Sequence, residues 1–177
     1  QMSDSQILAT IEDYARCASL AKKAGYDGVE IMGSEGYLIN QFLSNHVNKR
    51  TDRWGGDIEN RMRFPVEIVK AIRAKVGEKF IICFRLSMLD LVHDGNTMQE
   101  VIVIAKALEK AGITLLNTGI GWHEASEGSA WCAAGQGRER GDDPISSPWP
   151  VQSEGWDGRQ PTGFRRRRLL PVGSKAG

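Results

Sequence analysis

Three polar side chains in this sequence could act together on one ligand. They are Tyr37, Arg85 and His123, and each follows a short apolar segment of strand length. A phenol can deliver a proton, a guanidinium stabilises developing negative charge, and an imidazole can hydrogen-bond a carbonyl oxygen or exchange protons. Together they suit the reduction of a polarised double bond, in which a cofactor supplies a hydride and the tyrosine a proton.

Each of these residues also has a plainer interpretation. A tyrosine after a strand is more often a packing residue, and an arginine ending a strand commonly pairs with a loop carboxylate, here Asp90. A lone histidine usually lies in a loop, as we expect for His93. Taken singly, the plainer interpretations outweigh catalysis. The shared placement of Tyr37, Arg85 and His123 after successive strands is what favours the catalytic one.

The elements that must position these residues repeat in the order helix, glycine stop, strand. Apolar residues recur at helical spacing in three segments, about 4–24, 60–76 and 97–111. Capping boxes open the first and third, and a glycine follows each helix. The expected strands are 26–32, 80–84 and 113–116.

Apolar strands joined by helical crossovers indicate an α/β fold with a parallel sheet covered by helices. A barrel of repeated βα units and an open doubly wound sheet both fit. Because no G-x-G-x-x-G turn follows a strand, the open dinucleotide-binding fold is the weaker choice. In either fold ligands bind at the carboxyl ends of the strands, so Tyr37, Arg85 and His123 are expected to face one mouth.

Composition sets limits on the class of protein. The 177 residues suffice for one domain, and 41% hydrophobic with 25% charged residues is typical of a globular protein. A net charge of +1 argues neither for nucleic acid nor for a membrane surface, and we expect neither as a partner. No apolar run approaches the roughly 18 residues of a spanning helix, and no secretory leader opens the chain, so we expect a cytoplasmic protein.

The cysteines predict no metal site. Cys17, Cys83 and Cys132 lie far apart and form no C-x-x-C pair, which argues against a disulfide framework and against a zinc or iron–sulfur site. We expect Cys17 and Cys83 to be small buried hydrophobes. The segment 48–63 is dense in paired charges and is expected to be a solvated loop held by ion pairs.

The character of the sequence changes at Ser126. Residues 126–177 hold nine of the 20 glycines and five of the six prolines, and no helix or strand period survives there. A disordered tail is one interpretation, although its scattered tryptophans are unusual in disorder. We favour out-of-frame coding, with a natural domain over 1–125. The basic run 165–168 is therefore discounted as a nucleic-acid signal, and the opening Gln1 suggests a piece of a longer chain.

Several longer motifs resemble the old yellow enzyme family of flavin oxidoreductases. They cover about residues 3–125, and three of them, which begin at Met32, Phe84 and Asn117, are more narrowly similar to the bacterial 2,4-dienoyl-CoA reductases. The motifs are Gly28-Val29-Glu30-Ile31, Met32-Gly33-Ser34-Glu35-Gly36-Tyr37, Asn48-x-Arg50-x-Asp52-x-x-Gly55-Gly56, Glu59-Asn60-Arg61-x-Arg63-Phe64, Phe84-Arg85-Leu86-Ser87-Met88-Leu89-Asp90 and Asn117-Thr118-Gly119-Ile120-Gly121-Trp122-His123-Glu124-Ala125.

The resemblance implies the middle βα units of a partial TIM (β/α)8 barrel that binds FMN, followed by an irregular tail. It implies reduction of an acyl-CoA substrate, 2,4-dienoyl-CoA, in the breakdown of unsaturated fatty acids. In full-length relatives electrons pass from NADPH through FAD and a 4Fe-4S cluster to FMN. The other barrel strands and the FAD/NADPH domains would belong to that longer protein.

The resemblance also implies roles for single residues. Tyr37 falls at the proton donor and His123 at the residue that assists it, while Arg85 falls at the flavin-contacting arginine. His46 lies near a substrate-contacting loop. Glu124 and Ala125, which follow His123 directly, fall at substrate-binding positions.

This chain also differs from the full-length members of the family, and the differences determine what we expect of the chain alone. The strands that supply other flavin contacts are not in it, so we expect it neither to hold FMN tightly nor to turn over. Two alternatives stay open: another ene-reductase of the same family, and a non-catalytic α/β piece that binds a partner through exposed edges or its tail.

Overall fold

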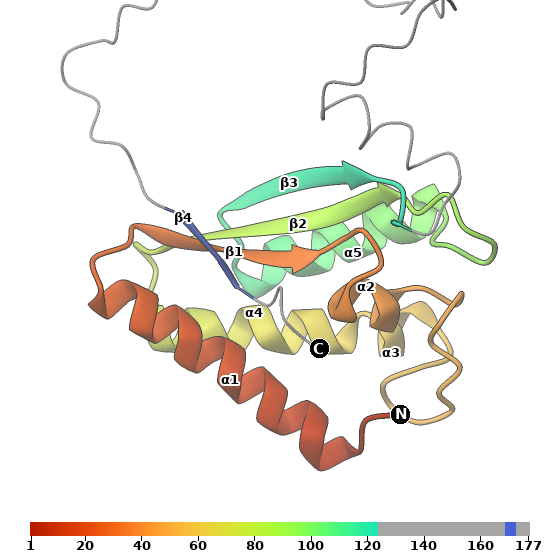
Figure 1. The fold of residues 1–177 in the computed structure, drawn as a ribbon, viewed down its shortest axis with the longest axis horizontal. Coiled ribbons are helices and arrows are strands. Elements are labelled where there is room, and N and C mark those ends of the chain that lie inside the picture. The colour runs from red at the N-terminus through yellow and green to blue at the C-terminus, as the bar shows by residue number, and fades with distance from the viewer. Residues whose placement is uncertain (124–168, 173–177) are drawn as a thin grey trace, which may run out of the picture.

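The computed structural model describes residues 1–123 and 169–172, which form a sheet with helices on one side (Figure 1). The strands are β1 (Gly28–Gly33), β2 (Ile81–Leu89), β3 (Leu115–Ile120) and β4 (Leu169–Val172). The helices are α1 (Asp4–Lys23), α2 (Leu38–Leu43), α3 (Ile58–Arg61), α4 (Arg63–Val76) and α5 (Met98–Ala111).

All pairs of neighbouring strands are parallel, in the order β3-β2-β1-β4. Across the central strands Met32 pairs with Arg85, and Arg85 pairs with Asn117. The expected parallel α/β sheet is therefore confirmed. The parallel direction brings the carboxyl ends of β1, β2 and β3 to the same edge, where the candidate residues follow.

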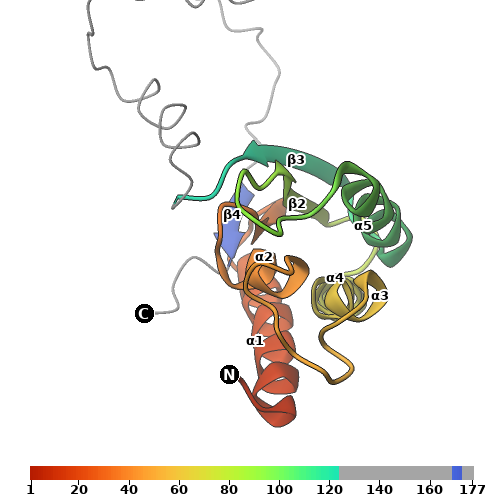
Figure 2. The ribbon, with the colours of Figure 1, turned by 90° about the vertical axis from the view of Figure 1, so that its right-hand side faces the viewer.

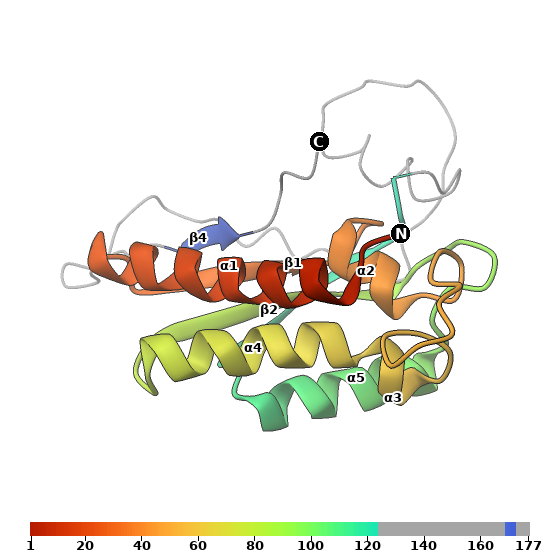
Figure 3. The same cartoon turned by 90° about the horizontal axis from the view of Figure 1, so that it is seen from below.

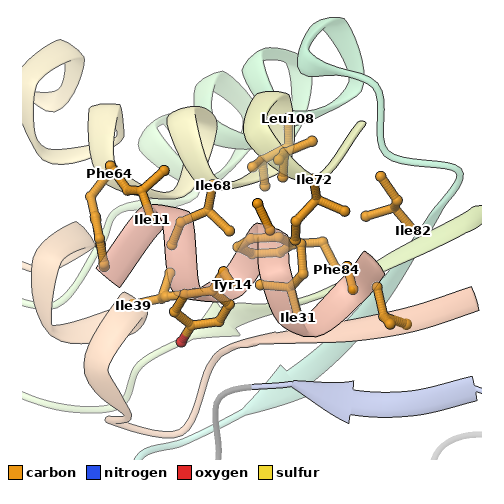
Figure 4. Packing of buried hydrophobic residues seen from close by; sticks show 14 of the residues in the cluster. Ile11, Tyr14, Ile31, Ile39, Phe64, Ile68, Ile72, Ile82, Phe84 and Leu108 are labelled. Carbon is orange, nitrogen blue, oxygen red and sulfur yellow. The ribbon is translucent and has the colours of Figure 1, made fainter. Parts of the chain in front are cut away.

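Helices α1, α4 and α5 lie side by side in chain order and cover one face of the sheet (Figures 2 and 3). Their apolar faces meet alternate residues of β1 and β2, such as Ile31, Ile82 and Phe84, none of which is exposed (Figure 4). Burying a side chain of this size contributes about 1.5–3 kcal/mol. Because side chains alternate along a strand, the intervening residues face away from the helices.

Helices α1 and α5 begin and end where the sequence predicted, whereas the segment expected as one helix over about 60–76 forms the end of α3 and the whole of α4. Ser3 with Gln6 and Thr97 with Glu100 form complete capping boxes at the starts of α1 and α5. Gly112 ends α5 with φ of 109°, a left-handed conformation that a residue with a Cβ adopts only at a cost.

Several boundaries differ from the prediction. Strand β2 continues to Leu89, so Arg85 lies inside a strand and not at its end. The short helix α2 directly after Tyr37 was not predicted, because six residues show too little periodicity. Cys17 is exposed on α1, contrary to expectation, whereas Cys83 is buried as expected.

The charged segment 48–63 is not simply a solvated loop. Arg61 is only 2% exposed, and its guanidinium donates to the carbonyl oxygens of Leu43 and Gly56 and pairs with Glu100. The sequence prediction was wrong here because a dense run of charges does not reveal which charge is enclosed by the fold. Through its ion pair with Glu100, Arg61 links this segment to the first turn of α5.

Strand β4 was not expected from the sequence. Its backbone pairs with β1 over Gly28–Ile31. The remaining residues of the predicted tail, 124–168 and 173–177, lie outside the described residues, so the domain limit at 125 and the out-of-frame origin stay predictions.

Within the two described stretches of chain, we find no helix with the length and apolar character required to cross a bilayer.

A first prediction concerns Glu100. Burial by itself raises the pKa of this carboxyl, but hydrogen bonds from Thr97 and Arg61 outweigh burial and lower the pKa below its ordinary 4.5. A lowered folded-state pKa adds stability above the unfolded pKa, and this stability is lost as pH falls through the folded value. We expect Glu100→Gln to lower the free energy of unfolding near neutral pH by about 1–2 kcal/mol. Its acid sensitivity should be smaller than that of the wild type.

Urea unfolding followed by circular dichroism at a series of pH values measures both effects. Glu109→Gln is the matched control, because Glu109 is exposed on the same helix. An unchanged dependence of stability on pH in Glu100→Gln would contradict the assigned role.

Candidate active site

Tyr37 and His123 meet beyond the carboxyl edge of the sheet. The tyrosine hydroxyl and His123 Nε2 are hydrogen-bonded at 3.0 Å, and the two rings stand edge to face with centroids 5.3 Å apart. Tyr37 precedes α2, and His123 follows β3. Side chains separated by 86 positions in the sequence are therefore joined by the fold.

A pocket of about 270 Å³ opens at this pair. Tyr37 is 38% exposed, so its hydroxyl is accessible to a ligand. The pocket is lined by Glu35, Gly36, Tyr37, Gln41, Val47, Trp122 and His123. It is small and open, and both polar and apolar groups face it.

The turn that presents Tyr37 is held by its own hydrogen bonds. Gly36 has φ of 83°; its N–H donates to Asn40 Oδ1 at 3.0 Å, and its carbonyl accepts from Gln41 Nε2 at 2.7 Å. A Cβ on Gly36 would come within 2.8 Å of the Trp122 ring. Both the backbone conformation and this close approach require glycine.

The segment carrying His123 is fixed to the end of β2. Gly121 N–H donates to the Leu89 carbonyl at 2.7 Å, and Trp122 N–H to the Asp90 carbonyl at 3.0 Å. The Trp122 indole Nε1–H donates to the Asp90 carboxylate at 2.9 Å. His123 N–H in turn approaches the Glu35 carbonyl at 3.5 Å, which links the two turns directly.

Arg85 lies on the sheet face opposite the helices and pairs with Glu35. The plainer interpretation, that Arg85 pairs with a loop carboxylate, is therefore confirmed, but the partner is Glu35 and not Asp90, which is bound by Asn40, Trp122 and Asn96. Arg85 is not among the residues that line the pocket, but its partner Glu35 is. Among the described residues the buried Arg85 Nε and the Ser87 hydroxyl have no hydrogen-bond partner. Buried polar groups are normally satisfied, so two unpartnered donors side by side on this face call for an explanation such as a bound ligand.

Comparison with known proteins identifies the family of this chain. Residues 1–132 match the NADH:flavin oxidoreductase / NADH oxidase family. The chain belongs to this family. It is 44% identical over 124 residues to a metal reductase of Desulforamulus reducens, an alignment that covers 70% of this chain and 19% of that protein.

Two solved structures extend the comparison. One is a 2-naphthoyl-CoA reductase in complex with 2-naphthoyl-CoA, with a TM-score of 0.68 and 42% identity over 71% of this chain and 19% of that one. The other is an old yellow enzyme homologue from Zymomonas mobilis, with a TM-score of 0.62 and 31% identity over 68% of this chain and 34% of that one. The chain thus spans only 19% and 34% of these two relatives, and its fold is part of the family's TIM barrel. The doubly wound alternative is set aside.

The chemistry of the sheet face fits the FMN implied by the family. A flavin ring presents carbonyl and nitrogen acceptors and becomes anionic when reduced, and the unpartnered Arg85 Nε and Ser87 Oγ are a cationic and a neutral donor. At Gly119 an added Cβ would lie 3.2 Å from the Glu35 carboxylate and 3.5 Å from Arg85 Nε, so a larger residue would crowd these groups. Arg85 and Ser87 are the described residues that would hold the ring.

The other predicted site residues have different outcomes. His46 is not among the pocket residues; it packs edge-on against Trp122 with ring centroids 5.5 Å apart. Its role toward substrate stays a prediction. Glu124 and Ala125 lie outside the described residues.

Sequence reasoning missed Glu35, Ser87 and the pocket residues Gln41, Val47 and Trp122. An acidic residue in the glycine turn before Tyr37 was a usable signal for Glu35. Ser87 and Trp122 lie within the motifs of the resemblance, but only the tertiary structure brings these residues, Gln41 and Val47 to the site.

A second prediction compares two glycines of similar backbone conformation. Gly36 and Gly56 have φ of 83° and 87°, but only Gly36 has a neighbour, Trp122, in the way of a Cβ. Each alanine variant incurs the left-handed strain of about 1 kcal/mol. Gly36→Ala must in addition displace Trp122, so we expect it to destabilise by about 1–3 kcal/mol more.

Chemical denaturation of both variants measures the difference. Equal losses of stability in Gly36→Ala and Gly56→Ala would show that the contact with Trp122 is not restrictive.

Proposed function

We propose that this chain is the central part of an FMN-dependent NAD(P)H oxidoreductase that reduces 2,4-dienoyl-CoA. The observation that carries the proposal is the hydrogen-bonded Tyr37–His123 pair at an open pocket. Reduction of a carbon–carbon double bond requires a hydride on one carbon and a proton on another. FMN, when bound, supplies the hydride.

Tyr37 supplies the proton in this mechanism. Its O–H can face a substrate only if His123 donates from Nε2–H to the phenolic oxygen, because in the other tautomer the hydroxyl proton is committed to the imidazole. That hydrogen bond also stabilises the phenolate left after proton transfer. The pair thus requires a proton on His123 Nε2.

Arg85 contributes charge. Its guanidinium is held by Glu35 at one end, while Nε is free to donate toward a ligand on the sheet face. A permanent cation there favours the negative charge that accumulates on a reduced ring system. Glu35 keeps the guanidinium in a fixed position and also lines the pocket next to Tyr37.

The acyl-CoA class of substrate is supported by the motifs shared with dienoyl-CoA reductases and by the similar 2-naphthoyl-CoA reductase with its naphthoyl-CoA ligand. Another ene-reductase reaction is the second candidate, favoured by the relatedness to an old yellow enzyme homologue. In the full protein, the other barrel strands and domains carrying FAD, a 4Fe-4S cluster and an NADPH site would deliver electrons. A cytoplasmic location is part of the same proposal.

A non-catalytic binding module is the remaining alternative. The observation in its favour is the apolar edge strand β3, on which Leu115, Leu116 and Ile120 are 51%, 42% and 46% exposed. In a longer chain, a neighbouring barrel unit would cover these residues, and we explain their exposure in this way. An exposed strand edge of this kind normally pairs or is covered.

The test is a chimaera in which residues 3–125 replace the matching part of the similar 2-naphthoyl-CoA reductase. We expect it to hold FMN and to reduce 2,4-dienoyl-CoA with NADPH. Tyr37→Phe should lower the rate by about 10²–10⁴-fold, because it removes the proton donor and leaves the ring in place. FMN content, read from flavin absorbance, should not change.

Tyr26→Phe is the control, since Tyr26 packs partly buried against the core. Full activity in Tyr37→Phe would refute the mechanism. A chimaera that reduces other enones but not 2,4-dienoyl-CoA would instead support the second candidate.

The isolated chain should behave differently. Because a complete barrel takes about 250 residues, the described strands offer only part of a flavin site. We expect the 177-residue chain, incubated with FMN and desalted, to retain well under one flavin per chain. A stoichiometric flavin spectrum after desalting would contradict this expectation.

A further inference from the structure

A buried carboxylate, Asp90, lies just beyond the end of β2 and has no place in the chemistry above. It is 3% exposed, yet four N–H groups converge on its two oxygens. Asn40 Nδ2 and Trp122 Nε1 donate to Oδ1 at 3.2 and 2.9 Å. The backbone N–H and Nδ2 of Asn96 donate to Oδ2 at 2.8 and 2.9 Å.

Two of these contacts lead to the two halves of the Tyr37–His123 pair. Asn40 holds Asp90 with its Nδ2 and the Gly36 N–H with its Oδ1, so it fixes the turn that presents Tyr37. Trp122 is adjacent in sequence to His123, and its ring packs against Gly36. One carboxylate oxygen therefore connects both segments that carry the pair.

The other carboxylate oxygen anchors this arrangement to the helix layer. Asn96 donates to Asp90 and accepts at Oδ1 from Arg61 at 3.1 Å. Arg61 is itself bound to Glu100 in the first turn of α5. The polar chain thus runs from the start of α5 to the pocket without a gap.

We propose that Asp90 is a positioning residue that holds Tyr37 and His123 within hydrogen-bonding distance of each other. The inference rests on the proposed function in one respect, that the Tyr37–His123 pair is catalytic. Asp90 touches neither ring of the pair. It acts through Asn40 on one side and through Trp122 on the other.

The chemistry requires a carboxylate at this position. All four partners are N–H donors, and an amide of the same shape accepts at one end only. Whichever way an asparagine is turned, its NH₂ faces two donors at close range. The isosteric change Asp90→Asn therefore disrupts one pair of contacts while the volume of the side chain is preserved.

The experiment is an NMR comparison of the full 177-residue chain, wild type against Asp90→Asn, without flavin. Ring centroids 5.3 Å apart predict nuclear Overhauser contacts between the Tyr37 and His123 rings in the wild type. We expect these contacts to be lost in Asp90→Asn, with the amide shifts of α1 and α4 unchanged. Asp94→Asn is the matched control, because the Asp94 side chain is 53% exposed in the same loop; it should keep them.

Preserved ring contacts in a folded Asp90→Asn would overturn the proposal. If that variant does not fold, Trp122→Phe decides, since it removes a single donor to Asp90 and retains an aromatic ring beside Gly36. Loss of the ring contacts in folded Trp122→Phe supports the proposal, and their retention overturns it. Because no flavin or substrate is present, a failure of the proposed reaction leaves this measurement unaffected.

Discussion

The packing of three helices against one face of a parallel sheet is the interaction on which the site depends. Ile31, Phe84 and Leu86 are buried beneath the helices. Because strand side chains alternate, this burial directs Glu30 and Arg85 to the opposite face. A shift of one residue in register would place a guanidinium in the apolar layer. The hydrophobic contact therefore decides which polar groups are available for chemistry.

The loops at the carboxyl edge are held by hydrogen bonds and not by the packing of helices on the sheet. Their fixed points are buried polar side chains, Asn48, Arg61 and Asp90, each with several hydrogen-bond partners. A buried polar group destabilises the fold unless it is satisfied, so each such group accepts few alternative positions. This explains how loops with little apolar surface can present Tyr37 and His123 at a defined distance. The positions of these two side chains are defined because hydrogen bonds are directional.

The face opposite the helices shows how this chain relates to its longer relatives. Asn117 donates across the sheet to Glu30, and Arg85 pairs with Glu35. Polar pairs on a barrel's inner face, beside an unpartnered Arg85 Nε, suit a surface that receives a ligand. The apolar β3 edge at Leu115 and Leu116 in turn suits a further βα unit. Family membership, the orphaned donors and the exposed edge are therefore mutually consistent.

The sequence by itself determined the order of the long helices α1, α4 and α5 and of strands β1, β2 and β3, the caps of α1 and α5, the parallel sheet, and the identity of Tyr37, Arg85 and His123 as candidates. These features depend on local periodicity, glycine stops and capping boxes, which are encoded within a few neighbouring residues. Only the tertiary structure decided that Arg85 pairs with Glu35, that Arg61 is buried, and that Asp90 connects the two turns. Those outcomes arise from contacts between residues far apart in the chain, and a linear pattern carries no information on which charge the fold encloses.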